Sequence, residues 1–551
     1  MDAYPLSDVT SCVWESWTTI PWDEAHQCVR RLQARISKAA KDENWRDVKR
    51  LQRLLVRSSS GKAVAVRRVT ENQGRRTPGV DNVVWSTSGE KWKAVQSLTT
   101  VGYKPLPLRR IHIPKANGGK RPLGIPAMRD RAMQALHWLA LDPVSEARAD
   151  PNSYGFRLYR STADALKQCE NALNRKASAQ WVLEGDIRGC FDNIDHDWLM
   201  AHVPMDRKVL SRWLKSGFME RGRFYPTEAG TPQGGIISPV LANLTLDGME
   251  RVLQDALPRR AKVNFIRYAD DFIVTADSKE LLETKVKPLI TEFLSERGLA
   301  LSETKTVVTH VSEGFDFLGF RVQKFKDFLY VGPSPKGTKA LYAKVSSTLR
   351  GLRTAKQGDV IRALNPILSG WAGYHRTMMA TRTFAVMDHR IFWALWRWAK
   401  RRHPNKGARW VRKRYFKASG PRHWVFTDGL STLVRLSDFK KRRHTKIRSE
   451  TNPYDPAQES YFDEVLKRRM LETLAGRRKL LWLLEKQEGV CPRCRAKITK
   501  QTGWHVHHRV WRVLGGTDKV SNLELLHPVC HGQLHACAGR VTLPPKSQGS
   551  G

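Results

Sequence analysis

The chain has 551 residues, with 95 lysines and arginines against 53 aspartates and glutamates, which gives a formal net charge of +42 at pH 7. Such an excess predicts a polyanionic partner, with nucleic acid the first candidate. No apolar run reaches the ~18 residues of a membrane span, and residues 1–17 lack signal-peptide features. We therefore expect three or four domains in a cytoplasmic, nucleoid-associated protein with no membrane partner.

The first predicted element covers residues 23–57. Its apolar side chains recur at helical spacing among arginines and lysines, at Val29, Leu32, Ile36, Val48, Leu51 and Leu54. This pattern predicts a pair of basic amphipathic helices ahead of the next domain.

A short hairpin is predicted further along the chain. Lys115 and Arg121 bracket an Asn-Gly-Gly turn, so the tip could place both cations over a triphosphate. Arginine holds phosphate in a bidentate fork and lysine acts as a point charge. A solvated basic turn is the alternative for this pair.

Three acids indicate a phosphoryl-transfer site. Asp186 ends a short apolar strand, and Asp270 and Asp271 lie between two β-branched and aromatic runs that predict a hairpin. Adjacent carboxylates repel each other, and a divalent metal offsets that repulsion. Three acids on neighbouring strands can hold two Mg²⁺ ions roughly 3.5–4 Å apart, so we expect a template-directed polymerase.

The composition changes near residue 334. Residues 341–450 contain 26 basic and 5 acidic residues, half of the whole net charge. Phe392, Leu395, Trp396 and Trp398 alternate with cations, which predicts a helix with a packed apolar face and a cationic face for a phosphate backbone. The run 440–446 is either a nucleic-acid contact or solvated charge.

The C-terminal part carries a second chemistry. Cys491 and Cys494 form a CxxC pair, and His527 and Cys530 have the same spacing, a set suited to structural Zn²⁺. Cys537 is the alternative fourth ligand to His527. A histidine-rich segment, with His505, His507, His508 and later Asn522, His531 and His535, is interwoven with this pair.

These motifs together resemble those of the bacterial group II intron-encoded proteins, which combine a reverse transcriptase, an RNA maturase and often an HNH endonuclease. The resemblance covers nearly the whole chain in the order of the family. It rests on the blocks at residues 68–81, 113–126, 153–157, 181–194, 230–239, 264–275, 301–306, 314–319 and 364–375, and on the histidine-rich segment.

The resemblance implies an α+β multidomain fold with right-hand polymerase fingers and palm, a helical thumb or maturase X domain, a basic DNA-binding region and a ββα-metal HNH nuclease domain. We expect a basic helical extension (1–75), fingers and palm (76–333), thumb (334–420), DNA-binding region (421–478), nuclease with structural zinc (479–540) and a flexible tail (541–551).

The resemblance also implies roles for single residues. In the polymerase, Phe191 would lie under the sugar of an incoming dNTP and exclude a 2′-hydroxyl, and Gln233 would line the nucleotide pocket beside Gly234. Lys305 is either a proton donor to pyrophosphate or an ordinary surface lysine.

In the nuclease, His508 would be the general base, and Asn522 would fix the loop that orients it. A single catalytic Mg²⁺ or Mn²⁺ would be held by His507 and His531, with His535 as a further ligand.

The implied function is to bind the intron's own RNA and stabilise its catalytic fold, which assists splicing. The resulting ribonucleoprotein would then insert the RNA into one strand of a DNA target. The nuclease would nick the second strand, and the new 3′-hydroxyl would prime copying of the intron. The alternatives are a free-standing, host-adapted reverse transcriptase with no intron partner, and a maturase without enzymatic activity.

Overall fold

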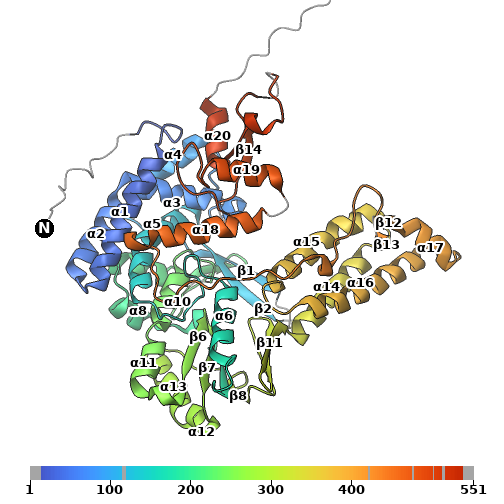
Figure 1. The fold of residues 1–551 in the computed structure, drawn as a ribbon. Coiled ribbons are helices and arrows are strands. Elements are labelled where there is room, and N and C mark those ends of the chain that lie inside the picture. The colour runs from blue at the N-terminus through green and yellow to red at the C-terminus, as the bar shows by residue number, and fades with distance from the viewer. Residues whose placement is uncertain are drawn as a thin grey trace, which may run out of the picture.

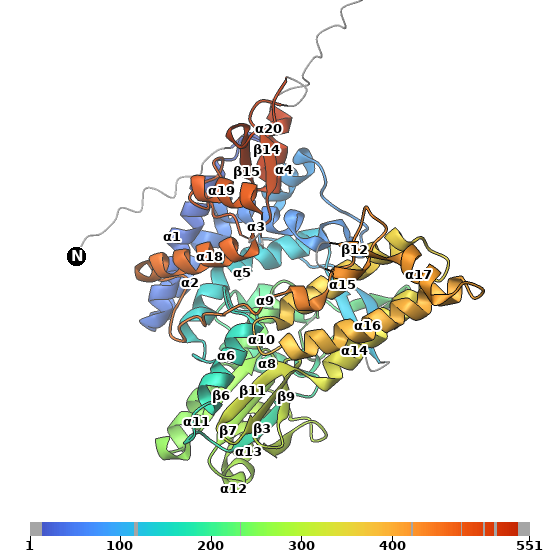
Figure 2. The ribbon, with the colours of Figure 1, turned by 45° about the vertical axis from the view of Figure 1, so that its right-hand side comes forward.

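The computed structural model describes residues 14–114, 119–231, 233–419, 422–474, 477–499, 502–511 and 515–537. Figures 1 and 2 show N-terminal helices beside a central fingers and palm region, a thumb that projects to one side, and a C-terminal unit over the N-terminal helices. The α+β multidomain architecture predicted from the sequence is confirmed. Among the described residues, no helix is long and apolar enough to cross a membrane.

Three N-terminal helices pack against one long central helix. α1 and α2 confirm the predicted helix pair, and their apolar faces, including Val29, Ile36 and Leu51, are buried. The side chain of Asn44 caps α2 by accepting a hydrogen bond from Asp47 N at 3.1 Å. The helices are α1 (Trp22–Lys41), α2 (Trp45–Arg57), α3 (Ser59–Glu71), α4 (Ser88–Ser97) and the central α5 (Met128–Arg148).

The fingers carry a four-stranded sheet in the order β2-β1-β4-β5. β1 and β2 form the predicted hairpin, in which Arg121 pairs with Ile113, while Lys115 lies outside the described residues. The strands are β1 (Leu108–Pro114), β2 (Lys120–Ile125), β4 (Phe218–Glu220) and β5 (Arg223–Tyr225).

The palm is a second four-stranded sheet, in the order β6-β7-β3-β8, covered by helices on both faces. Val182 and Leu183 on β3 are both fully buried and belong to different core clusters, because successive side chains of a strand point to opposite faces. The strands are β3 (Trp181–Asp186), β6 (Asn264–Tyr268), β7 (Asp271–Ala276) and β8 (Val307–His310).

Short helices connect and cover the palm strands. They are α6 (Thr162–Leu173), α7 (Cys190–Asn193), α8 (His196–His202), α9 (Arg207–Leu214), α10 (Ser238–Leu246), α11 (Met249–Ala256), α12 (Lys279–Leu281) and α13 (Lys287–Ser295). A three-stranded sheet of β9 (Phe315–Phe317), β10 (Phe320–Phe325) and β11 (Phe328–Pro333) then leads to the thumb.

The thumb has its own apolar core of helices and one hairpin. Its elements are α14 (Pro335–Gly351), α15 (Gln357–His375), α16 (Thr381–Arg402), α17 (Ala408–Tyr415), β12 (Phe416–Ser419) and β13 (Arg422–Phe426). Leu395 and Trp398 are buried in this core, with Phe392 and Trp396 partly buried against it, as the helical spacing predicted.

The sequence-based boundary at residues 420 and 421 falls inside the β12–β13 hairpin. Phe426, Leu433 and Leu436 lie beyond that boundary and continue the thumb core. We therefore propose that the thumb extends to about residue 439.

A segment that we term the connector, residues 440–458, runs from the thumb over the palm to α1. Ile447 N donates to Asp164 Oδ1 at 2.9 Å, and His444 Nε2 lies 2.9 Å from the same oxygen. Asn452 Nδ2 donates to Ser37 Oγ on α1 at 2.9 Å. Part of the basic run 440–446 is therefore held by contacts within the chain.

The C-terminal unit follows the connector. α18 (Glu459–Thr473) lies beside α5 in both views of the fold, and the other elements are α19 (Arg478–Lys486), β14 (His505–His508), β15 (Leu523–Leu526) and α20 (Pro528–Cys537). β14 and β15 form an antiparallel hairpin against which α20 packs, the ββα arrangement expected of this unit.

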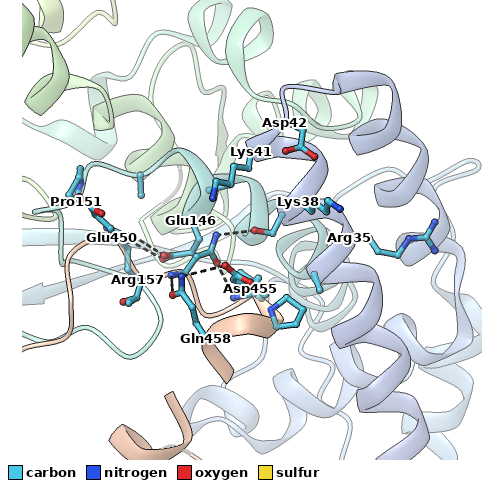
Figure 3. A pocket seen from close by; sticks show the side chains of 18 of the residues that line it. Arg35, Lys38, Lys41, Asp42, Glu146, Pro151, Arg157, Glu450, Asp455 and Gln458 are labelled. Atoms are coloured by element: carbon cyan, nitrogen blue, oxygen red, sulfur yellow. Dashed lines mark hydrogen bonds and ion pairs between the residues drawn. The ribbon is translucent and has the colours of Figure 1, made fainter. Parts of the chain in front are cut away.

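A buried ion pair near the connector generates a stability prediction. The side chains of Arg157 and Glu146 are only 4% and 2% exposed and lie 2.8 Å apart, and Arg157 also donates to two carbonyl oxygens (Figure 3). Glu146→Gln leaves a buried guanidinium uncompensated, so we expect the free energy of unfolding to fall by about 3–5 kcal/mol. Urea unfolding followed by tryptophan fluorescence measures it.

Asp359→Asn is the matched control, because it breaks a solvent-exposed pair with Arg362. We expect it to change the free energy of unfolding by less than about 1 kcal/mol. Equal effects of the two substitutions would contradict the importance of the buried pair.

Candidate functional site

The three predicted polymerase acids meet at one end of the palm sheet. β6 and β7 form the predicted hairpin with Ala269 and Asp270 between them, and Asp271 begins β7. Asp186, the last residue of β3, is the register partner of Asp271. Opposite residues of an antiparallel pair lie roughly 4.5–5.5 Å apart, so the strands bring these carboxylates together.

Negative charge accumulates at this end of the sheet. The pKa of Asp271 is raised to about 6 by desolvation, and further by the charges of Asp270 and Asp186. Lys305 Nζ donates to Asp186 Oδ2 at 2.8 Å and offsets part of this repulsion. Three oxygen ligands with unfavourable mutual repulsion are a suitable donor set for divalent cations such as Mg²⁺.

Residues that the motif search did not single out support the hairpin tip. Arg267 is fully buried, is paired with Asp247, and donates to Ala269 O at 3.3 Å and to Asn243 Oδ1. Ala269 has φ +59°, a conformation that non-glycine residues rarely adopt. Arg267 therefore braces a strained turn next to Asp270.

Gly155 packs directly against this turn. A Cβ at this position would lie 2.2 Å from Ala269 N, so no larger residue fits without moving the hairpin. Gly155 belongs to the block at residues 153–157, but no pattern in the sequence identified Ala269 as its partner.

The nucleotide-pocket residues flank a cavity of about 380 Å³ between palm and fingers. Phe191 and Gln233 both line it, together with Arg110 and Asp192. Gln233 Nε2 donates to the Asp192 carboxylate at 3.3 Å, and the Phe191 ring meets the ring of Phe156 edge-on at 6.0 Å.

Two features of this region differ from the sequence expectation. Arg121 is an exposed side chain on β2 and is not among the residues that line the cavity. Phe156, which no sequence argument had singled out, is 49% exposed with φ +62°. Phe156 lies against the Phe191 ring but is not among the residues that line the cavity.

The cysteines of the C-terminal unit form a compact cluster with one histidine. Ligand atoms of Cys491, Cys494, His527 and Cys530 all lie within 4.8 Å of one another, and all four residues are buried. Their number, softness and spacing fit tetrahedral Zn²⁺. The side chain of Cys537, the alternative ligand, lies outside the described residues.

The nuclease histidines form a second cluster on β14 and α20. Ligand atoms of His507, His531 and His535 also lie within 4.8 Å of one another, which fits one divalent cation. The pKa of His531 is lowered to about 4 by burial and by the neighbouring histidines, so its ring is neutral and free to bind a metal at pH 7.

Of the two remaining nuclease residues, His508 is the last residue of β14, and Asn522 lies between β14 and β15. Asn522 clamps the loop between these strands, because its side chain accepts from Val510 N at 2.8 Å and donates to Val510 O at 3.0 Å and Thr517 O at 2.9 Å. His508 Nε2 lies 2.7 Å from Asp518 Oδ1. Asp518 was not identified from the sequence, since its partner is ten residues away on another segment.

Contacts between side chains dock the zinc-type cluster on the N-terminal helices. Arg67 of α3 is buried and donates to Cys530 Sγ at 3.7 Å and to Glu71 at 2.8 Å. Gln533 Nε2 donates to Trp17 O at 3.1 Å. The nuclease unit is therefore joined to the reverse transcriptase end of the chain by buried polar contacts as well as by the connector.

Four protein-family models match the chain in order. They are the N-terminal domain of reverse transcriptase (residues 17–98), reverse transcriptase (113–322), the group II intron maturase-specific domain (338–416) and HNH endonuclease (491–536). The first extends past residue 75, where the sequence had placed the end of the N-terminal extension.

Curated relatives agree with the family models. Protein YkfC of Escherichia coli is 33% identical over 321 residues, covering 50% of this chain and 83% of YkfC. Group II intron-encoded protein LtrA of Lactococcus lactis subsp. cremoris is 31% identical over 357 residues, covering 52% of this chain and 59% of LtrA. A putative COX1/OXI3 intron 1 protein of Saccharomyces cerevisiae is 24% identical over 362 residues, covering 55% of this chain and 43% of that protein.

Together, the ordered domains and these relatives assign the chain to one family. It is a member of the group II intron-encoded proteins, an enzyme that joins reverse transcriptase, maturase-specific and HNH endonuclease domains in one polypeptide.

Proposed function

We propose that this protein assists the splicing of its own intron RNA and then copies that RNA into a DNA target that it nicks itself. The observation that carries the proposal is the presence in one chain of two separate candidate catalytic centres. One is the set of aspartates that the strand register brings to one end of the palm sheet, and the other is the histidine cluster on β14 and α20. A free-standing reverse transcriptase has no need for the second cluster.

For the polymerase, Asp186, Asp270 and Asp271 would hold two Mg²⁺ ions. Bound there, the ions supply positive charge to the attacking and leaving oxygens of an in-line phosphoryl transfer. Lys305 lies close enough to Asp186 to exchange partners when the carboxylates bind cations, and its ammonium group can then donate a proton to the leaving pyrophosphate.

For nucleotide selection, Phe191 would stand under the sugar, and Gln233, which lines the same cavity, would contact the nucleotide. Lys115 and Arg121 would bind the triphosphate from the β1–β2 hairpin. Asp192 and Arg110 line the same cavity.

For the nuclease, His508 would take a proton from the attacking water, and Asp518 and Asn522 would hold its imidazole and its loop. His507, His531 and His535 would bind a Mg²⁺ or Mn²⁺ ion, which supplies charge to the phosphodiester. Cys491, Cys494, His527 and Cys530 would hold a structural Zn²⁺ that fixes the unit.

For the nucleic acids, the N-terminal helices and the thumb would bind intron RNA. The thumb exposes the large aromatic rings of Trp393, Trp410 and Trp424, and Arg412 lies over the ring of Trp424 at 4.7 Å. Exposed rings interleaved with arginine suit structured RNA, which is bound through phosphates and stacking. The connector and α18 would face target DNA.

The two centres should be separable by mutation. Asp270→Asn removes a metal ligand of the palm, so we expect primer extension to fall by about 10³-fold or more. His508→Ala removes the general base and should lower DNA nicking by about 10²–10⁴-fold. Each variant should retain the other activity, measured on a primed RNA template and on a labelled duplex. Loss of both activities in either variant would contradict independent centres.

The sugar selectivity of the polymerase should depend on Phe191. In Phe191→Ala the ring no longer occupies the space of a 2′-hydroxyl, so we expect ribonucleotide kcat/KM to rise by about tenfold or more relative to dNTPs. Single-nucleotide extension with matched dNTP and NTP measures the ratio. Phe224→Ala, which alters an exposed ring of β5 outside that cavity, should leave the ratio unchanged.

The zinc-type cluster should hold the nuclease unit on the N-terminal helices. Cys494→Ser should remove bound zinc, detected by elemental analysis, and should make residues 475–490 more sensitive to limited proteolysis. Primer extension should persist, because the palm does not use this cluster. Cys28→Ser is the control, since Cys28 lies on α1 outside the cluster, and it should keep its zinc. Full zinc content in Cys494→Ser would refute the assigned ligand set.

A further inference from the structure

A cationic cavity of about 450 Å³ lies between α2, α5 and the start of α9, outside both catalytic centres. Five of the side chains that line it are basic, and one is acidic. The cations are Lys49, Arg53, Arg57, Arg207 and Lys208.

None of these five cations is neutralised by a neighbouring acid within the described part of the chain. The acid that lines the cavity, Asp206, already accepts from Lys208 N at 2.9 Å and Val209 N at 3.2 Å, and so caps α9. The net positive charge that faces the cavity therefore comes from the five basic side chains and not from the N-terminus of α9.

A buried polar atom gives a second, independent observation. His137 of α5 lines the cavity and is 5% exposed, and its Nε2 has no hydrogen-bond partner. A buried polar nitrogen without a partner is unfavourable unless a ligand supplies the missing hydrogen bond. Burial lowers the pKa of this imidazole to about 4, so the neutral ring can donate one hydrogen bond from Nε2 to an oxygen ligand.

A larger cavity has no such excess of positive charge. The cavity of about 570 Å³ between α1, the end of α5 and the connector is lined by four basic side chains and by four acids that balance them (Figure 3). The basic residues are Arg35, Lys38, Lys41 and Arg157, and the acids are Asp42, Glu146, Glu450 and Asp455. Of these two cavities, only the α2–α5–α9 cavity has basic side chains without a matching number of acids.

We propose that the α2–α5–α9 cavity binds a phosphate group, held by Arg53, Arg57, Arg207 and the imidazole of His137. Arginines from α2 and α9 and one buried neutral donor from α5 match the several oxygens of a phosphate ester. Two sources supply this chemistry, a phosphate of a bound RNA strand and a free polyphosphate such as that of a nucleotide. With an RNA strand as the source, the proposal rests on the proposed binding of intron RNA by the N-terminal helices and names a site for it. It is separate from the polymerase and nuclease assignments, because none of these residues lies in either centre.

The test measures binding of tripolyphosphate by calorimetry, and of an RNA decamer without terminal phosphates by fluorescence anisotropy, to the full chain with no added divalent metal. The variants are Arg53→Gln/Arg57→Gln and, from α9, Arg207→Gln. The control is Arg46→Gln/Arg50→Gln, which removes the same charge from α2 at positions that do not line the cavity. Primer extension on a short template reports that each variant is folded.

We expect the dissociation constant of one probe to rise about tenfold in each cavity variant, with little change in the control. Weakened tripolyphosphate binding identifies a free polyphosphate as the source, and weakened binding of RNA alone identifies a strand phosphate. Equal weakening by cavity and control variants, or no weakening of either probe, would overturn the proposal.

Discussion

The antiparallel register of β3 and β7 is the constraint on which the polymerase centre depends. It places Asp186 opposite Asp271, and a slip of one residue would turn the Asp186 side chain to the other face of the sheet. Gly185 fixes this register, because its Cβ would lie 2.1 Å from the ring of Phe272. The ring fills the space that any larger residue would need, so packing holds together carboxylates that repel each other.

Buried contacts also hold charged groups in place under the tip of the β6–β7 hairpin. Arg267 and Asp247 are both buried, and burial raises the pKa of Asp247 to about 7 although the arginine opposes this. Such a pair contributes little net stability but defines one geometry, because removing either partner leaves a buried charge. We propose that its value here is to hold Ala269 in its left-handed conformation.

Local patterns predicted the elements that carry the chemistry. Alternating runs predicted the β6–β7 hairpin and β3, helical spacing predicted α1, α2 and α16, and paired CxxC and HxxC motifs grouped the four zinc-type ligands. These features are encoded within about ten residues, where propensity and periodicity act.

Long-range contacts could not be predicted in this way. Arg67 meets Cys530 across 463 positions, and Gly155 meets Ala269 across more than a hundred. Gly420 and Pro421, at the sequence-based thumb boundary, are a turn signal that is typical of linkers as well as of hairpins. Only the shared core of Phe426 and Leu436 distinguishes the two cases.

The cations that have no acidic partner indicate which surfaces of the protein bind nucleic acid. In the connector, Arg442 pairs with Glu472 and His444 with Asp164, so the basic run 440–446 is partly neutralised by the chain itself. On the thumb, cations that include Lys400, Arg409 and Lys413 have no acidic partner among the described residues. Counterions condense on phosphates and are released only by cations that are not already paired. We therefore propose that the thumb contributes more of the salt-dependent affinity for RNA than the connector, although the connector has the denser basic sequence.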